Sequence, residues 1–348
     1  MKKLFLLSLY LIYTNVHPIT LKKIVGIDDG WSFFFINENK IITTEKTGSI
    51  KLFHIKNKRI ENIKHNLSIN ISGQGALMDI ISHNGIIFVS YSEKMSNGST
   101  TSLATGIIKN NQINFKNIFR ALPIIKSNYH YGGRLVLKDD TIYLTVGDRG
   151  KGMIAQDYKT HPGSIIKIKI DGEIVLDNPR YQNNKDWLPE IFQIGVRNPQ
   201  GLEYSSMDKK IYITNHGAMG GDWFGVLKKG ENYGWKILGW GGKNYVGTKI
   251  GPKWTPEFSK AIHYWVPSIG VSSLIIYKGK EFEEWNGNAL ITSLKDKSLR
   301  RIVFNENQFI KENIILKDKI GRIRDIELNP IDGKIYLLGG NALWQLSR

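Results

Sequence analysis

The stretch KDDTIYLTVGDRG (residues 138–150) decides the fold, because its pattern returns along the whole chain. It joins a polar turn, an apolar strand and a polar loop that contains glycine. The same order recurs in NENKIITTEKTG (37–48), SHNGIIFVSYSE (82–93), MDKKIYITNHGAMGG (207–221), WNGNALITSLKD (285–296) and IDGKIYLLGGN (331–341). Aligned on their apolar pairs, these segments stand 45 to 79 residues apart, slightly above the roughly 40 to 50 residues of common propeller repeats. They predict an all-β, six-bladed β-propeller over residues 22–348.

Further strands are expected between these repeats, at 133–137, 164–170, 273–277 and 323–328, where β-branched residues are frequent. Turns of the Asn-Gly or Asp-Gly kind precede strands in any β-protein, but six such segments in order favour the propeller. Equivalent loops of a propeller converge on one funnel. The residues after the six strands are mostly polar or charged, which predicts a ligand site there: Glu45, Lys46, Ser90, Tyr91, Asp148, Arg149, His216, Gly217, Lys295, Asp296, Gly339 and Gly340.

The amino-acid composition excludes several classes of binding partner and site. The 48 Lys and Arg residues exceed the 31 Asp and Glu residues and give a formal charge of +17. The basic residues are scattered and form no run of five, so we expect no nucleic-acid partner, although an acidic ligand would suit a site where several of them converge. The absence of cysteine excludes disulfides, zinc-thiolate sites and a cysteine nucleophile.

The N-terminal stretch MKKLFLLSLYLIY (1–13) has two lysines followed by apolar residues, as in a secretory signal peptide. It is too short to span a bilayer. We therefore expect a signal peptide over residues 1–17, export to the periplasm or the medium, and no stable membrane insertion. A buried first strand is the alternative.

Two motifs supply candidate chemistry. His130 precedes the Gly-Gly-Arg turn at 132–134, and Asp148 follows one strand later. A histidine can accept a proton near neutral pH, and an aspartate can fix its tautomer, although a lone histidine before such a turn is more often structural. Arg197 lies on the turn GVRNPQGL (195–202), where a guanidinium could bind a planar anion or a carbonyl oxygen, or could instead satisfy loop carbonyls.

Two further elements could hold a charged cofactor. The glycine-rich segment NHGAMGGD (215–222) can expose backbone carbonyls to a hard cation such as Ca²⁺. It lacks the Lys-Ser/Thr ending of a P-loop. Lys295, Arg322 and Arg324 supply cations, and strand alternation places the two arginines on one face, where they could hold an anion or lie on a solvated strand edge.

Taken in order, these motifs resemble the soluble pyrroloquinoline quinone-dependent glucose/sorbosone dehydrogenases, closest to the bacterial aldose sugar dehydrogenases. The resemblance covers about residues 22–348 and rests on these segments: HYGGRL (130–135), GDRG (147–150), AQD (155–157), DG (171–172) with DNP (177–179), RNPQGL (197–202), HG (216–217) before GGD (220–222), NYGW (232–235), LK (294–295) and RIRD (322–325).

The resemblance implies an enzyme that oxidises aldoses to lactones and passes the electrons to an external acceptor. His130 would take the proton of the anomeric hydroxyl while hydride passes from C1 to the quinone, and Asp148 would orient His130. The resemblance also implies that Arg197 polarises the quinone carbonyl and that Asn198 contacts the cofactor. Gly217 and Ala218 would bind Ca²⁺ through their backbone carbonyls, and Lys295, Arg322 and Arg324 would hold the quinone and its carboxylates. Gln74, Tyr264 and Trp265 would lie beside the substrate.

The chain departs from the family pattern at three positions. Ala218 stands where proline is usual, which a backbone ligand tolerates. Trp223 replaces a glutamate, which leaves a second, structural calcium site in doubt, and Asn215 replaces another glutamate. Two other functions stay open at this point: a metal-dependent propeller lactonase, and a non-catalytic propeller that binds a sugar or a protein.

Overall fold

Antiparallel strands are the main regular element of the structure, a computed structural model that describes residues 18–348. The predicted signal peptide, residues 1–17, lies outside the described residues. Within 18–348 the helical elements are three short 3₁₀ turns: η1 (Gly152–Gln156), η2 (Pro179–Tyr181) and η3 (Glu283–Trp285). The prediction of an all-β chain is confirmed. In the described part of the chain, no helix has the length and apolar character needed to cross a membrane.

One sheet has nine strands, arranged as two runs of four strands joined by a short ninth strand. The first run comprises β2 (Gly30–Asn37), β3 (Lys40–Glu45), β4 (Ile50–His54) and β5 (Arg59–His65). The second run comprises β6 (Leu77–His83), β7 (Ile86–Met95), β8 (Gly98–Lys109) and β10 (Lys116–Arg120), and β9 (Gln112–Ile113) connects the runs by pairing with both β5 and β8.

Four separate four-stranded sheets follow, each with its strands in chain order except the last. The first comprises β11 (Gly132–Lys138), β12 (Thr141–Val146), β13 (Ser164–Lys169) and β14 (Ile191–Ile194), and the second comprises β15 (Pro199–Tyr204), β16 (Ile211–Asn215), β17 (Asp222–Val226) and β18 (His263–Trp265). The third comprises β19 (Val271–Ile276), β20 (Ala289–Ser293), β21 (Ser298–Asn305) and β22 (Gln308–Lys317). The last comprises β23 (Ile323–Leu328), β24 (Ile335–Gly339) and β25 (Ala342–Ser347), and β1 (Thr20–Gly26) pairs with the outer edge of β25. The first described strand thus pairs with the last.

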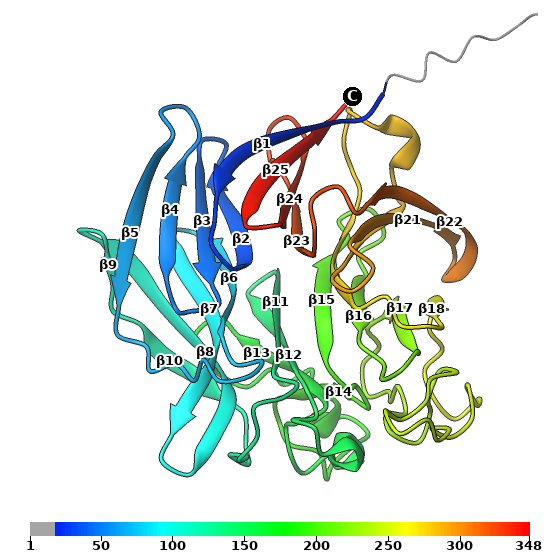
Figure 1. The fold of residues 1–348 in the computed structure, drawn as a ribbon. Helices are drawn as coiled ribbons and strands as arrows, with labels where there is room; N and C mark the ends of the chain where they lie inside the picture. Colours follow the sequence, from blue (N-terminus) through cyan, green and yellow to red (C-terminus); the bar gives the residue numbers. More distant parts are fainter. Residues whose placement is uncertain (1–17) are drawn as a thin grey trace, which may run out of the picture.

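The sheets stand around a common centre (Figure 1). The innermost strands β2, β6, β11, β15, β19 and β23 contact one another in this order, and β23 contacts β2, which closes a ring. Each of the six repeated segments in the sequence forms the strand next to this ring: β3, β7, β12, β16, β20 and β24. The arrangement is propeller-like, and the repeats mark equivalent strands.

Hydrophobic packing between neighbouring sheets holds the ring together. In β12, Ile142 and Leu144 point into one core cluster, whereas Tyr143 between them packs against Phe192 in the next cluster. Side chains alternate between the two faces of a strand, so both faces of this sheet are covered by neighbours. This explains why the repeated strands are apolar at nearly every position instead of at alternate ones.

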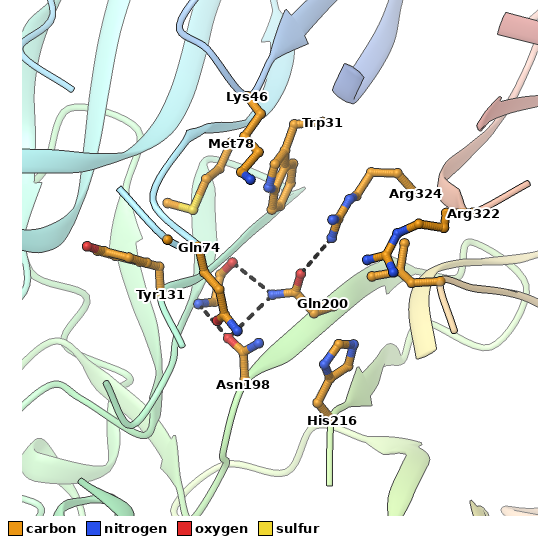
Figure 2. A pocket seen from close by; sticks show the side chains of 13 residues that line it. Trp31, Lys46, Gln74, Met78, Tyr131, Asn198, Gln200, His216, Arg322 and Arg324 are labelled. Carbon is orange, nitrogen blue, oxygen red and sulfur yellow. Dashed lines mark hydrogen bonds between the residues drawn. The ribbon is translucent and has the colours of Figure 1, made fainter. Parts of the chain in front are cut away.

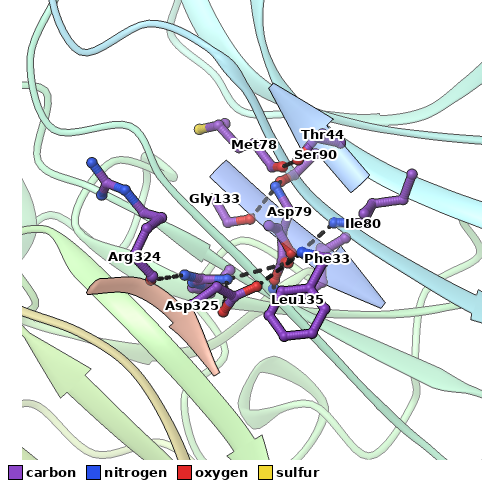
Figure 3. A network of polar contacts seen from close by, with 12 residues as sticks. Phe33, Thr44, Met78, Asp79, Ile80, Ser90, Gly133, Leu135, Arg324 and Asp325 are labelled. Atoms are coloured by element: carbon purple, nitrogen blue, oxygen red, sulfur yellow. Dashed lines mark hydrogen bonds and ion pairs between the residues drawn. The ribbon is translucent and has the colours of Figure 1, made fainter. Parts of the chain in front are cut away.

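A buried polar network ties four inner strands together, β6, β11, β15 and β23 (Figure 3). Arg134 of β11 places Nη1 2.8 Å from Asp325 Oδ1 of β23 and 3.4 Å from Asp79 Oδ1 of β6. Its Nε donates to the Gln200 carbonyl at 2.7 Å and its Nη2 to the Arg324 carbonyl at 2.9 Å. The network therefore fixes the register of the inner strands immediately below the loops that carry the candidate site.

Candidate functional site

His130 and Asp148 meet because β11 and β12 are antiparallel. Gly132 pairs with Val146, so the residue two before the first strand and the residue two after the second lie at the same end of the sheet. His130 Nδ1 is 2.6 Å from Asp148 Oδ1. Gln74 Oε1 accepts the backbone N–H of His130 at 2.8 Å, and the positive φ of His130 (48°) turns the chain toward β11. The predicted pair is thus held from both sides.

Asp148 has three donors around its carboxylate. Besides His130, the backbone N–H of Gly150 donates to Oδ1 at 2.8 Å, and the Trp235 indole N–H donates to Oδ2 at 2.6 Å. A carboxylate that accepts these bonds is ionised, so the hydrogen between the two side chains lies on His130 Nδ1. The Nε2 atom of His130 is left as a lone-pair acceptor.

The electrostatic surroundings keep His130 neutral. Burial lowers the pKa of His130 below its usual 6.5, and the positive charges of Arg197 and Arg149 lower it further, whereas the hydrogen bond and charge of Asp148 raise it. The net direction is downward. An imidazole with a lowered pKa is unprotonated at neutral pH and can accept a proton there.

A pocket of about 300 Å³ lies against this pair. Its lining includes His130, Asp148, Arg197, Ala218 and Trp235. The Arg197 guanidinium lies 5.4 Å from the centre of the Trp235 ring. A general base, a cation and a backbone carbonyl segment therefore share one cavity, which we call the histidine pocket.

A second pocket of about 200 Å³ lies nearer the centre of the ring, and we call it the arginine pocket (Figure 2). Its cations are Lys46, Arg322 and Arg324, and none of its lining residues is acidic. Asn198 and Gln74 also line it. Because Gln74 binds the backbone of His130 and Asn198 follows Arg197 in the chain, the two pockets are neighbours.

Arg324 is held in place inside the arginine pocket. Its Nη1 donates to Gln200 Oε1 at 3.2 Å, and its guanidinium lies 5.8 Å from the centre of the Trp31 ring. Burial, followed by repulsion from Arg134 and Arg322, lowers the pKa of Arg324 to about 10. The charges of Asp29 and Asp325 oppose this lowering, but neither residue lines the arginine pocket, where clustered cations favour a bound anion.

The glycine-rich segment after β16 is organised by Asp222. Asp222 Oδ1 accepts the Gly217 N–H at 2.8 Å and the Ser268 hydroxyl at 2.7 Å, and Oδ2 accepts the Gly270 N–H at 2.6 Å. This carboxylate is therefore saturated by donors. A side chain at Gly217 would approach the Gly220 carbonyl to 2.3 Å, so the tight turn requires glycine there.

His216 precedes this turn and is neutral. Its Nε2 bonds to the Val271 carbonyl, which can only accept, so Nε2 carries the hydrogen. Burial is the main reason that its pKa falls to about 4. His216 lines the arginine pocket, although the sequence reasoning gave it no individual role.

The candidate ligands for a calcium ion are the backbone carbonyls of Gly217 and Ala218. Within residues 18–348, no group of three or more His, Asp or Glu side chains could hold a metal. The Ala218 carbonyl accepts the Ser268 hydroxyl at 3.1 Å and keeps a second lone pair. Backbone carbonyls suit Ca²⁺, but these two alone fall short of its usual six to eight oxygens. The residues fit calcium only together with oxygens from a bound ligand.

Three residues expected at the site lie elsewhere. Lys295 is exposed and is not among the lining residues of either pocket. Trp265 is buried on the edge strand β18, and its indole donates to Glu312 at 2.9 Å. Tyr264 lines a different surface pocket, where Lys253 lies 4.5 Å from its ring centre.

Arg149 is expected to face the funnel, but its side chain packs inside the protein instead. It is buried, with its guanidinium 3.6 Å from the Tyr131 ring centre and Nε donating to the Tyr129 carbonyl at 2.9 Å. It therefore supports the loop that carries His130. Trp31, Trp235 and Gln200 are site residues whose contacts the sequence reasoning missed. Trp235 is part of the NYGW motif (232–235), and no pattern in the sequence marks Trp31 as a site residue.

Comparison with known proteins shows the family of this chain. The family model described as Glucose / Sorbosone dehydrogenase matches residues 27–348. An aldose sugar dehydrogenase of Escherichia coli is 29% identical over 335 residues, which cover 92% of this chain and 89% of that protein. Quinoprotein glucose dehydrogenase B of Acinetobacter calcoaceticus is 24% identical over 300 residues, covering 65% of this chain and 61% of that protein.

A solved structure is also similar. The apo-form of the soluble aldose sugar dehydrogenase of Escherichia coli superimposes with a TM-score of 0.89 at 27% identity, covering 94% of this chain and 99% of that one. The family match spans nearly all described residues and includes every strand from β2 to β25. The chain therefore belongs to the glucose/sorbosone dehydrogenase family.

Proposed function

We propose that this protein is an exported six-bladed propeller that oxidises aldoses to lactones with pyrroloquinoline quinone and Ca²⁺. The observation that carries the proposal is the histidine pocket: an unprotonated His130, oriented by Asp148, shares one cavity with Arg197 and lies beside the arginine pocket. The two four-strand runs of the nine-stranded sheet, counted with the four separate sheets, support six blades.

His130 acts as the general base in this proposal. Its Nδ1–H is held by Asp148, so Nε2 is free to take the proton of the anomeric hydroxyl. As the O–H bond of the anomeric hydroxyl breaks, a double bond forms between C1 and its oxygen. The hydrogen on C1 must then leave as a hydride, with its electron pair. The imidazolium that results is stabilised by the charge of Asp148, which opposes the effect of burial.

When bound, pyrroloquinoline quinone would accept this hydride at a carbonyl carbon and later release the electrons to an external acceptor. Arg197 and Asn198 would lie on its carbonyl side, and Arg322 and Arg324 would bind its carboxylates, as the cationic arginine pocket supports. Lys295 keeps the role given by the family resemblance only if its exposed side chain turns inward.

Calcium would contact the carbonyls of Gly217 and Ala218 and take its remaining oxygens from the cofactor and from water. Asp222 accepts the Gly217 N–H and is not itself available, since hydrogen bonds from Gly217, Ser268 and Gly270 saturate it. Gln74 would contact the substrate, because its side chain lines the arginine pocket and binds the backbone of His130. The positions of Tyr264 and Trp265 do not support substrate contacts for them.

A metal-dependent lactonase is less well supported. Such an enzyme would hold its ion on several side-chain carboxylates, and the described residues offer no cluster of that kind. It would also have no use for Arg322 and Arg324 facing a pocket without acidic residues.

The proposal is tested by reconstituting the apoprotein with pyrroloquinoline quinone and Ca²⁺ and measuring dye reduction with a panel of aldoses. We expect turnover that needs all three components. His130→Gln should retain cofactor absorbance and lose most turnover. The matched control is His83→Gln on β6, which lies outside both pockets and should behave as the parent. No turnover with any aldose, or full turnover in His130→Gln, would overturn the proposal.

A further inference from the structure

The histidine pocket carries more positive charge than the proposed reaction requires. Besides Arg197, its lining includes Lys151 and Lys236. Its only acidic lining residue is Asp148, whose oxygens are occupied by His130, Gly150 and Trp235. The lining of the cavity therefore includes two lysines that no carboxylate of the same wall neutralises.

Neither lysine is engaged elsewhere. Within residues 18–348, neither the Lys151 nor the Lys236 ammonium has an ion-pair partner within 4.0 Å or a side-chain hydrogen bond. By contrast, the ammonium groups of Lys167 and Lys229 both form ion pairs with Asp177. Uncommitted cations in a concave site are the usual signature of an anionic ligand.

The backbone of each lysine lies close to Asp148, the residue that orients His130. The backbone N–H of Lys151 donates to the Asp148 carbonyl at 2.9 Å and closes a turn. Lys236 directly follows Trp235, whose indole binds Asp148 Oδ2 at 2.6 Å. The Lys236 stem also crosses Gly152, where an added Cβ would lie 2.9 Å from its Cδ. The backbone positions of both lysines are therefore tied to the segments that hold Asp148.

We propose that Lys151 and Lys236 select aldoses that carry an anion at the end distant from C1, either a carboxylate or a phosphate. This rests on the proposed function and names its substrate class. A hexose bound in this cavity with its anomeric carbon at His130 would have its far end within the same lining, which includes the two lysines. The reaction at C1 is unchanged, and the anionic group takes no part in it.

The magnitude follows from the exposure of the groups. Lys151 is exposed and Lys236 is half-buried, so each contact should contribute as a surface ion pair does, and the double variant should lose about three- to tenfold in selectivity. The contribution should weaken as salt is added, because the Debye length is about 8 Å at physiological ionic strength.

The test compares sugars that differ only at C6, with the holoenzyme. We measure kcat/KM for glucose, glucuronate and glucose 6-phosphate, in low and high salt, for the parent and for Lys151→Met, Lys236→Met and the double variant. We expect a higher kcat/KM for at least one anionic sugar, and a larger loss for that sugar than for glucose in each variant. Which of the two anions is preferred separates a carboxylate from a phosphate.

Lys109→Met is the matched control, because Lys109 is an exposed lysine of β8 that lines neither pocket. It should leave all three ratios unchanged. Equal kcat/KM values for glucose and both anions overturn this inference while leaving the proposed function intact. A double variant that changes only the KM for the electron acceptor also overturns it, because the lysines would then serve acceptor docking. Failure to oxidise any sugar contradicts the proposed function instead.

Discussion

Replacing Asp148 with asparagine tests how the base is oriented. The change keeps the shape of the side chain and replaces one acceptor oxygen with an NH₂ donor. All three partners of Asp148 donate: His130 Nδ1, the Gly150 N–H and the Trp235 indole N–H. Whichever way the amide turns, its NH₂ group faces a donor at a position where the native distance is 2.6 Å.

The two orientations have different costs. With the NH₂ toward Trp235, the indole N–H loses its acceptor, at a cost of about 1–3 kcal/mol in the free energy of unfolding. With the NH₂ toward His130, the ring must accept on Nδ1 and carry its hydrogen on Nε2, which removes the base. Loss of a positioned general base lowers kcat by about 10²- to 10⁴-fold.

The pH dependence gives a second readout. Asp148 raises the pKa of His130 against the effect of burial. Without that charge the pKa of His130 falls further, so the ascending limb of kcat/KM should move to lower pH while its plateau drops. We would measure turnover from pH 4.5 to 9 and unfolding by denaturant, with the exposed Asp140→Asn as control. A variant that keeps kcat within about twofold and the same pH profile would refute the orienting role.

Three further changes probe the frame of the site. Arg134→Met leaves Asp79 and Asp325 buried without their cation and should lower the free energy of unfolding by about 3–5 kcal/mol in urea titrations; a change below about 1 kcal/mol would contradict the network. Arg149→Ala should lower stability by about 2–4 kcal/mol and reduce kcat, because Arg149 holds the loop that carries His130; an unchanged thermal midpoint would argue against this. Burial raises the pKa of Glu203 from 4.5 to about 8, so between these pH values the folded state holds a proton that the unfolded state loses. The free energy of unfolding should therefore fall as pH rises from about 4.5 to about 8. Glu203→Gln should flatten this fall, and an identical slope in the variant would refute the assignment.

Local sequence patterns predicted the strands well because each repeat is self-contained. The segment 138–150 holds its own turn, strand and loop, and β12 forms where the pattern places it. The pairing of His130 with Asp148 was also predictable, since one antiparallel hairpin brings the two residues together. Arg322 and Arg324 line a shared pocket, but Arg322 lies before β23 begins and the register shifts between Ile323 and Asp325, so strand alternation does not account for the pair.

Contacts between distant loops were not predictable in this way. Trp235 reaches Asp148 across 87 positions through a loop without strand periodicity, and Trp31 approaches Arg324 only when the ring closes between β2 and β23. Tyr264 and Trp265 were assigned from the family pattern alone, and they lie on the edge strand β18, away from the ring. The packing partners of an edge strand depend on the tertiary arrangement and not on its own pattern.

The most direct measurement of the central claim is a single reconstitution experiment. Apoprotein is mixed with pyrroloquinoline quinone and Ca²⁺, and lactone formation from an aldose is followed together with dye reduction, in the parent and in His130→Gln. The account predicts one lactone formed for each two electrons delivered to the dye, and a loss of both signals in the variant while the cofactor stays bound. Equal lactone formation without the quinone, or in His130→Gln, would contradict it.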